Sequence, residues 1–476
     1  MNKLVVFLLL ITAALSAQEF GFGFDDEETS SGTGTSASGS LNVSIGGEVS
    51  ATMLGYGSDF HKGAESVELG DIFSGKLNFS AKASVVEGVI NLKIQTKKDE
   101  VVKIDEGYLR AYFGKFDVEA GLRKLTWGKA DSMGPLDVIN PLDTSQIYTE
   151  MADNTSLMGV KIARPLVHAS FRFGQFSKIE GVFIPYFEGH YIPSEGRWAP
   201  AEMEMLKNPK IPTSIPVDIN ITDTEPDTTT INYAQGGLRF TTTIGSSDIG
   251  MQYYYGRMHQ PAAKISLTNL IMNPPFSADV NVSYLYNPYH QIGLDYAQVL
   301  LGLNVRAEVA ANITEDLKGD DGSVYNPSIA WSFGFDRNLF LGINLNLQVN
   351  ESIRLMQNKL GKSINKLDMN DIDISTIMTS GSYNFDNIDI EGGKPLTSTR
   401  LTAALSKKFL RDELELRTAV VWGIEDMDCL IMPALIWTKD ALRTALSGGI
   451  FAGNKEGQLG QYADNNFVKV SLTYSF

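Results

Sequence analysis

The chain has 476 residues, a mean hydropathy of −0.08 and a formal net charge of −16 at pH 7. The acidic balance argues against nucleic acid as a partner, because binding to phosphates depends on basic side chains. Beyond the first residues, no stretch approaches the ~20 consecutive apolar residues that a transmembrane helix needs. A membrane protein of such a composition must pair its backbone between strands that are apolar only at alternate positions.

Residues 1–17 are predicted to be an export signal. Lys3 begins it, an uncharged apolar stretch follows from Leu4 to Leu15, and Ser16 and Ala17 provide small residues for cleavage. No cysteine lies near this site, which argues against a lipid-anchored lipoprotein, and an uncleaved anchor helix is the alternative. Residues 18–40 are polar and rich in Ser, Gly and Thr, which predicts a flexible periplasmic lead-in.

From residue 41 to residue 476, segments of alternating apolar and polar residues are separated by turn residues. The clearest are 116–123, 303–313, 414–422 and 467–476, and we also expect strands at 157–174 and 262–272. Tight turns are expected at 114–115, 245–248, 336–338, 410–413 and 438–441, and long extracellular loops at 128–156, 189–230 and 352–396. The pattern predicts an all-β fold, a transmembrane antiparallel up-and-down barrel of about 18 strands, with 16–20 allowed.

The last strand carries the strongest signal for a membrane barrel. Its apolar residues share one face and its polar residues share the other: Val468, Val470, Leu472, Tyr474 and Phe476 against Lys469, Ser471, Thr473 and Ser475. Aromatic rings favour the membrane interface, so Tyr474 and Phe476 are expected to act as an assembly signal for the barrel-insertion machinery. We therefore expect the protein in the outer membrane of a diderm bacterium, in contact with its lipid.

The stretch 103–200 resembles a known family. Its blocks are Asp105-Glu106-Gly107-Tyr108-Leu109, Gly121-Leu122-Arg123-Lys124, Trp127-Gly128-Lys129-Ala130-Asp131, Asp137-Val138-Ile139-Asn140-Pro141-Leu142-Asp143, Glu180-Gly181-Val182-Phe183-Ile184-Pro185 and Gly196-Arg197-Trp198. Together they are similar to a poorly characterised family of outer-membrane porin-like β-barrels, related in style to alginate-export-type porins. The resemblance implies that a solute passes through the barrel but does not name it.

The loop that follows Trp127 contains an acidic and amide-rich motif, Asp131, Asp137, Asn140 and Asp143. We expect these side chains to cap backbone amides and to hold the loop in order, against the wall or inside the pore. A calcium site from the three carboxylates is the alternative, because hard cations bind oxygen ligands.

Charged residues recur on the polar faces of several predicted strands. We expect eight of them to line the lumen and to set ion selectivity: Glu106, Arg110, Glu119, Arg123, Arg306, Glu308, Glu415 and Arg417. The alternative is that they pair across strands and only stabilise the wall.

One pair of residues invites a catalytic interpretation. His168 and Ser170 share one strand face, as in the His-x-Ser pair of outer-membrane phospholipase A. Their face is the polar one, however, so lumen lining is the favoured interpretation, and no catalytic residues are predicted. The histidines lack metal-ligand spacing and nucleotide motifs are absent, so no metal or cofactor is expected. Cys429 is alone and forms no internal disulfide.

The leading functional hypothesis is a porin through which small polar solutes diffuse across the outer membrane. One alternative is a barrel plugged by the segment with Phe20, Phe22 and Phe24, which would transport hydrophobic substrates. Another is a surface adhesin that displays the loops 189–230 and 352–396.

Overall fold

The computed structural model describes residues 41–60, 73–96, 101–154, 156–203, 218–271, 277–356, 382–384, 391 and 394–476. The expected export signal (1–17) and lead-in (18–40), with Phe20, Phe22 and Phe24, lie outside the described residues.

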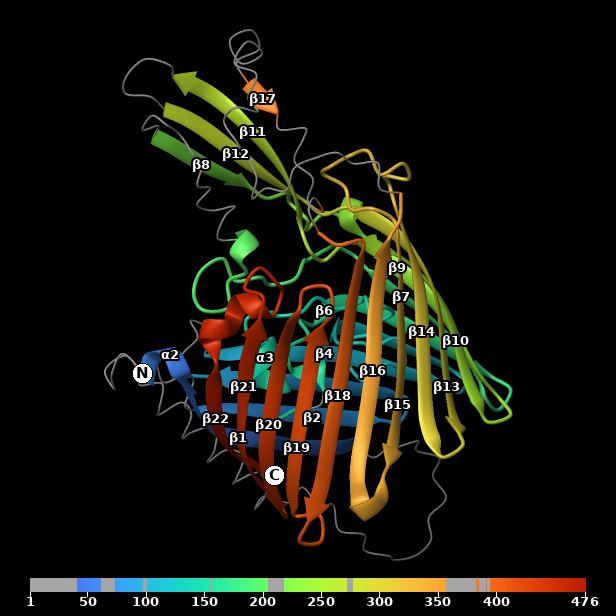
Figure 1. Ribbon diagram of the computed structural model, residues 1–476. Coiled ribbons are helices and arrows are strands. Elements are labelled where there is room, and N and C mark those ends of the chain that lie inside the picture. Colours follow the sequence, from blue (N-terminus) through green and yellow to red (C-terminus); the bar gives the residue numbers. More distant parts are fainter. Residues whose placement is uncertain are drawn as a thin grey trace, which may run out of the picture.

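Eighteen strands form one closed antiparallel sheet, a barrel (Figure 1). In order around the ring they are β1 (Leu41–Tyr56), β2 (Phe73–Ala83), β3 (Val86–Gln95), β4 (Val102–Phe113), β5 (Phe116–Arg123), β6 (Arg164–Phe173), β7 (Ser177–Ile184), β9 (Gln235–Ile244), β10 (Ser247–Arg257), β13 (Pro288–Leu300), β14 (Leu303–Thr314), β15 (Ser328–Asn338), β16 (Ile343–Arg354), β18 (Thr397–Phe409), β19 (Leu414–Gly423), β20 (Asp428–Lys439), β21 (Leu442–Gly453) and β22 (Phe467–Ser475). Each strand pairs with the next in this order, and β22 pairs with β1 to close the ring. The predicted fold class and strand number are confirmed.

The last residue completes the closure. Gly47 and Phe476 exchange two backbone hydrogen bonds of 3.0 Å, so the chain end is paired with β1. Tyr474 stands on the outer face of β22, opposite Val49 of β1 and Leu442 of β21. The two residues of the expected assembly signal therefore lie at the seam where the barrel closes.

The two faces of the barrel follow the alternation of the sequence. On β22, Val468, Val470 and Leu472 are exposed on the outside, while Lys469 and Ser471 are buried on the inside. On β14, Val309 is exposed outside and Glu308 is buried inside. Strand alternation thus gives an apolar outer surface and a polar inner wall.

A second, four-stranded sheet lies beyond one end of the barrel, away from the C-terminus (Figure 1). It contains β8 (Asp218–Thr224), β11 (Ala262–Ile271), β12 (Ser277–Leu285) and β17 (Ser382–Asn384). The pairing of β8 with β12 is parallel, and the other two pairings are antiparallel. Strands β8 and β17 thus come from the predicted long loops 189–230 and 352–396.

Two strand predictions need correction. Segment 262–272 does contain a strand, but it belongs to the small sheet, because β10 ends at Arg257 and Pro261, which has no N–H, interrupts the ladder. Segment 157–174 is not one strand. Residues Leu157–Gly159 form the 3₁₀ helix η2, and β6 begins only at Arg164, because residues up to 163 bend into the barrel.

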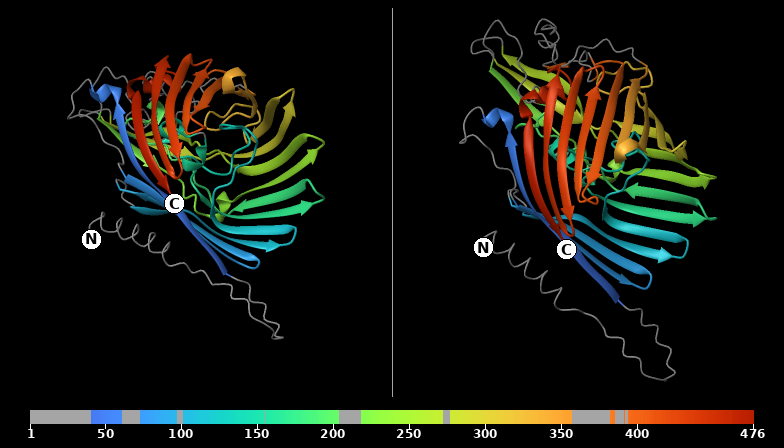
Figure 2. Two further views of the ribbon diagram at one scale, coloured as in Figure 1. Left: turned by 90° about the horizontal axis from the view of Figure 1, so that it is seen from below. Right: turned by 60° about the horizontal axis from the view of Figure 1, so that its bottom comes forward.

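The helices of the described chain are short: α2 (Gly57–Phe60), α3 (Ile147–Met151), η3 (Ile231–Tyr233), η4 (Phe340–Gly342) and η7 (Gly460–Asn465), besides η2. Among the residues that the structure describes, no helix has the length and apolar character to cross a membrane. The helix that matters most for the site described below is α3, which lies inside the ring of strands (Figures 1 and 2).

Candidate functional site

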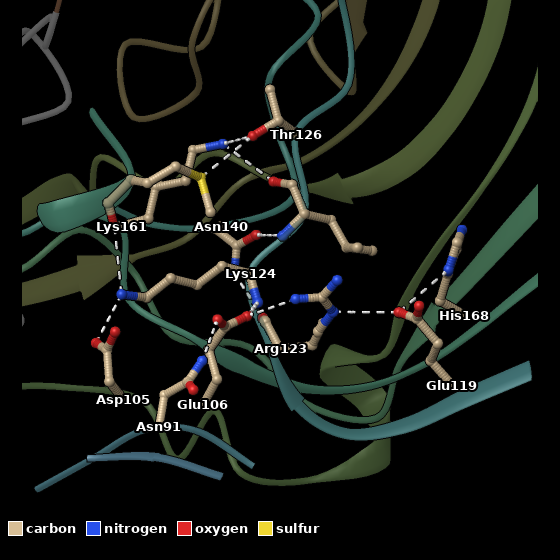
Figure 3. A network of polar contacts seen from close by, with 12 residues as sticks. Asn91, Asp105, Glu106, Glu119, Arg123, Lys124, Thr126, Asn140, Lys161 and His168 are labelled. Carbon is tan, nitrogen blue, oxygen red and sulfur yellow. Dashed lines mark hydrogen bonds and ion pairs between the residues drawn. The ribbon is translucent and has the colours of Figure 1, made fainter. Parts of the chain in front are cut away.

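The lumen of the barrel is crossed by residues 124–154 and 156–163, which leave β5 and return to β6; we name them the inward segment. Its two limbs are joined near the wall by Asn140 (Figure 3). The Asn140 side chain accepts a hydrogen bond from the N–H of Leu125 (2.7 Å) and donates to the carbonyls of Arg123 (3.1 Å) and Ile162 (2.9 Å). One buried amide therefore satisfies three backbone groups and fixes the point where the segment enters the lumen.

A buried lysine strengthens this junction. Lys161 donates to the carbonyl of Leu125 (3.0 Å) and to the hydroxyl of Thr126 (2.7 Å), and its ammonium lies 2.6 Å from a carboxylate oxygen of Asp137. Burial raises the pKa of Asp137, and the ammonium of Lys161 opposes that rise. The beginning, the middle and the end of the inward segment are thereby tied together.

The first half of the inward segment lies against the wall of β14 and β16. The carboxylate of Glu308 on β14 accepts hydrogen bonds from the backbone N–H groups of Lys129, Ala130 (2.7 Å) and Leu136 (3.4 Å). On β16, the side-chain oxygen of Gln348 accepts from the N–H groups of Asp131 (3.1 Å) and Ser132 (3.2 Å). We name this contact the amide anchor, because the segment contributes backbone amides and the wall contributes acceptors.

The second half lies against the wall of β19, β21 and β22. The buried carboxylate of Asp153 is 3.0 Å from the ammonium of Lys469 and accepts a hydrogen bond from Ser471 (3.1 Å). Arg443 lies 4.0 Å from the same carboxylate, and Arg417 donates to the carbonyl of Ala152 (3.1 Å). We name this contact the carboxylate anchor, because here the segment contributes the acid and the wall contributes the cations.

Aromatic packing holds α3 beside the carboxylate anchor. The ring of Tyr148 lies 5.5 Å from Trp198, 5.2 Å from Phe451 and 5.5 Å from Tyr462, measured between centroids. Such tilted and edge-on arrangements are favourable beyond the burial of apolar area. The inner wall at β19–β22 is therefore packed with side chains rather than open.

The wall from β3 to β13 differs, because it carries a continuous ladder of charged side chains. Arg110 donates to Glu119 (2.6 Å), and Arg123 bonds both Glu119 (3.1 Å) and Glu106 (2.9 Å), as Figure 3 shows in part. Tyr112 connects this group to Glu87 of β3 through a hydrogen bond of 2.5 Å.

The ladder continues across four further strands. His168 of β6 lies 3.6 Å from Glu119 and 3.2 Å from Glu180 of β7. Arg239 of β9 lies 3.8 Å from Glu180 and 2.6 Å from Asp295 of β13. Each charged side chain of the ladder thus has a neighbour of opposite charge. The wall can therefore bury these side chains without leaving any of their charges uncompensated.

The eight residues expected to line the lumen all lie on the inner face, but they differ in what they contact. Glu106, Arg110, Glu119 and Arg123 belong to the ladder. Of the others, Glu308 and Arg417 hold the inward segment, and Arg306 pairs with Asp131 of that segment and with Asp336 (2.9 Å). Glu415 is partly buried and stands in register with Lys408.

Charged residues that share a strand face do not always pair with each other. In the described part of the chain, Arg306 forms no ion pair with Glu308, and Arg417 forms none with Glu415. The reason is the inward segment, whose backbone groups and Asp131 compete for these side chains. Strand alternation predicted the face of each residue and gave no information about a segment folded onto that face.

The loop motif is distributed along the inward segment. Trp127 is buried with Ile139 and Tyr254, and Asp143 accepts a hydrogen bond from the N–H of Ser145 (3.0 Å). Asp131 bonds Asn346 (2.8 Å) as well as Arg306, and Asp137 bonds Lys161. The three carboxylates have separate partners, so the calcium alternative lacks a gathered ligand set, and the described residues contain no cluster suited to a metal ion.

His168 and Ser170 lie on the inner wall, while Val167 and Phe171 are exposed outside. The partners of His168 are Glu119 and Glu180. Sequence reasoning missed other residues of the lumen: Asp153, Gln348, Lys469 and Ser471. The alternation of 467–476 had placed Lys469 and Ser471 on the polar face, but nothing in the sequence indicated their partner.

No family model matches the sequence, and no curated protein matches it. Solved structures with similar architecture include OccK3 (OpdO) of Pseudomonas aeruginosa, with 10% identity, a TM-score of 0.48 and coverage of 91% of this chain and 96% of that chain. Others are Salmonella typhi OmpF in complex with daunomycin (6%, 0.39, 91% and 97%) and Wzi of Escherichia coli, described as a carbohydrate-binding β-barrel involved in group 1 capsule assembly (10%, 0.43, 90% and 84%). All three TM-scores lie below 0.5, and the barrel fold of this chain follows from its own strand pairings.

Proposed function

We propose that the protein is an outer-membrane channel through which small polar solutes diffuse. The observation that carries this proposal is the closed strand ring with an apolar outside and a charged inside, narrowed by one inward segment. The apolar outside matches lipid, and closure leaves no unpaired strand edge to meet it.

The wall chemistry supports polar solutes. The ladder carries carboxylates and guanidinium groups, and Glu87, Arg110 and Arg123 keep 19–26% of their side chains exposed, so they can replace the hydration shell of a polar solute as it passes. The charged side chains of this ladder provide no apolar surface against which a hydrocarbon-like substrate could pack. The predicted resemblance to alginate-export-type porins agrees with a polar cargo and remains an expectation for this chain.

The partners we propose follow from the same surfaces. Outer-membrane lipid covers the apolar outside, and the insertion machinery recognises the last strand with Tyr474 and Phe476. Export requires the predicted signal at 1–17. The solutes themselves contact the ladder and the inward segment.

Reconstitution of the purified, refolded protein into planar lipid bilayers tests the proposal. We expect stepwise, ohmic conductance in potassium chloride that persists in the absence of any ligand. Bilayers that stay silent although the protein is folded and inserted would contradict a passive channel, and would favour the alternative of a plugged barrel. Binding of host ligands without conductance would favour the adhesin.

A further inference from the structure

Three lysines stand side by side on the inner wall, away from both anchors. Lys76 of β2 is opposite Lys93 of β3, and Lys93 is opposite Lys103 of β4. Neighbouring strands are ~4.8 Å apart, so the three side chains leave the wall as one row. Val102 and Ile104, which flank Lys103, are exposed on the outer face (43% and 52%), and alternation therefore turns Lys103 to the lumen.

The row is short of negative charge. Lys76 is 2.7 Å from Glu48 of β1, whereas Lys93 and Lys103 have no carboxylate within ion-pair distance among the described residues. By contrast, the buried ammonium groups of the lumen each have a carboxylate at 2.6–3.0 Å: Lys124 with Asp105, Lys161 with Asp137 and Lys469 with Asp153.

Like charges directly opposite each other on neighbouring strands destabilise a sheet. If these lysines served only the stability of the wall, we would expect a carboxylate beside each of them, as each arginine of the neighbouring ladder has. The row is also accessible, because the side chain of Lys76 is 45% exposed and Lys103 is exposed. Lys103 is exposed and has no carboxylate partner among the described residues, so it is available to a solute, with the half-buried Lys93 directly opposite it.

The inward segment presents an acid to the same region. A Cβ at Gly159 would lie 3.5 Å from an oxygen of the Glu150 carboxylate, and the carbonyl of the neighbouring Met158 accepts a hydrogen bond from Lys124 (3.3 Å). Lys124 in turn pairs with Asp105 of β4, so Glu150 of α3 lies on the side of the lumen where β4 carries Lys103. The position of α3 is fixed by the rings around Tyr148 and by Asp153 at its end. The lysine row and Glu150 therefore keep a constant relation to each other.

We infer that Lys76, Lys93 and Lys103 bind the oxyanion of a permeating solute, a carboxylate or a phosphate, with Glu150 weakening that binding enough for release. This inference rests on the proposed channel function and names the chemistry of its solutes. Ammonium groups bind oxyanions through charge-assisted hydrogen bonds, which are stronger than neutral ones. A nearby carboxylate keeps the affinity low, and conduction requires that a bound solute can leave.

The test compares wild type with the double variant Lys93→Gln/Lys103→Gln in planar bilayers. The matched control is Lys115→Gln/Lys439→Gln, which removes the same charge from two exposed positions, the turn after β4 and the last residue of β20. Acetate, succinate and inorganic phosphate are each added to chloride solutions, and the block of the chloride current is titrated. Heat-modifiable migration in gels confirms that every variant is folded.

We expect block of wild type by at least one oxyanion, and a half-blocking concentration raised ~tenfold or more in the double variant, as loss of a charge-assisted bond implies. The reversal potential in a salt gradient should shift towards cation preference, most strongly at low salt. Glu150→Gln should lower the half-blocking concentration, and the control should resemble wild type. Block by succinate alone would identify carboxylates, and block by phosphate alone would identify phosphates.

Two results would overturn the inference. A double variant that conducts with unchanged block and unchanged reversal potential would show that the row binds no solute, while the channel function would stand. A folded wild type that never conducts would remove both the inference and the channel function. The two failures are therefore distinguishable in one set of recordings.

Discussion

The two anchors of the inward segment bind neighbouring parts of the wall, β14–β16 and β19–β22, with reversed chemistry. At the amide anchor, the wall side chains Glu308 and Gln348 accept hydrogen bonds from backbone N–H groups of the segment. At the carboxylate anchor, the side chain of Asp153 accepts from Lys469 and Ser471 of the wall. One contact depends on the path of the backbone, and the other depends on a single side chain.

This difference determines which substitutions each anchor tolerates. The amide anchor is insensitive to most side chains of the segment, but it needs close approach: a Cβ at Gly128 or Gly134 would lie 2.4 Å from an oxygen of Glu308. At Gly128 the backbone angle φ of +96° also favours glycine. The carboxylate anchor tolerates side chains around it but not the loss of its charge.

The largest effect is expected for Asp153→Asn. The change leaves the buried ammonium of Lys469 without its counter-charge, and breaking a buried pair costs ~3–5 kcal/mol. Hydrogen exchange of the amides in 147–153 should accelerate accordingly, while the control Asp440→Asn at an exposed turn should not. Unchanged protection in 147–153 would mean that the rings around Tyr148 hold α3 without the carboxylate.

The next largest effect is expected for Glu308→Ala. It leaves the N–H groups of Lys129 and Ala130 without an acceptor, at a cost of ~1–3 kcal/mol. Exchange should increase at 129–136 and stay unchanged at 147–153, because the other anchor is intact. Glu315→Ala, at an exposed position beyond the end of β14, is the matched control. Equal loss of protection at both ends would show that the two anchors open as one unit.

A smaller effect is expected for Gly134→Ala. The new Cβ would lie 2.4 Å from an oxygen of Glu308, which can shift, and 2.6 Å from the Cβ of Ala130, which its backbone holds in place, so the cost should fall within the ~1–3 kcal/mol known for overpacking. Gly159→Ala, whose nearest neighbour would be at 3.5 Å, is the control within the same segment. In a double-mutant cycle with Glu308→Ala, the cost of Gly134→Ala should fall only in part, because the approach to the Cβ of Ala130 remains. Strict additivity of the two changes would place the strain elsewhere.

The smallest effect concerns acidification. His190 accepts a hydrogen bond from the N–H of Leu142 (2.9 Å), and burial lowers its pKa to about 4. In the unfolded chain the pKa of His190 has its ordinary value near 6.5, so between pH 6.5 and pH 4 the unfolded chain binds more protons than the folded one. The stability of this contact therefore falls as the pH falls from 6.5 towards 4. Between pH 7 and pH 6 the loss should remain below ~1 kcal/mol.

Exchange of the Leu142 amide between pH 7 and pH 5, corrected for intrinsic rates, measures this loss. His190→Asn is the matched variant, because its oxygen can accept the same bond and does not titrate. A pH dependence that survives in His190→Asn would assign the effect to another group, such as the neighbouring buried His259, whose pKa burial also lowers strongly.

The barrel itself was predictable because its signal is local. In β22 the polarity of each residue indicates whether it lies on the outer or the inner face, and the same alternation recurs on β14 and β19. Alternation does not say which sheet a strand joins, so 262–272 was assigned to the barrel although β11 pairs with β12 and β17. Segment 157–174 was misassigned because the bend of 157–163 depends on tertiary contacts such as that of Lys161 with Asp137.

The anchors could not be predicted, because their partners are remote in the sequence. Asp153 and Lys469 are separated by 316 residues, and Ala130 and Glu308 by 178. The amide anchor adds a second difficulty, since its donors are backbone groups that every residue possesses. The sequence showed an Asp- and Asn-rich loop and the polar faces of strands, but the correspondence between them exists only in three dimensions.

The central claim is that α3 of the inward segment borders a water-filled path through the barrel. The most direct test introduces a cysteine by Glu150→Cys in a Cys429→Ser background and adds a bulky anionic thiol reagent during single-channel recording. We expect the conductance to fall in one irreversible step, while Val468→Cys on the outer face, 53% exposed, leaves it unchanged. A channel that conducts equally before and after complete modification at position 150 would contradict the account.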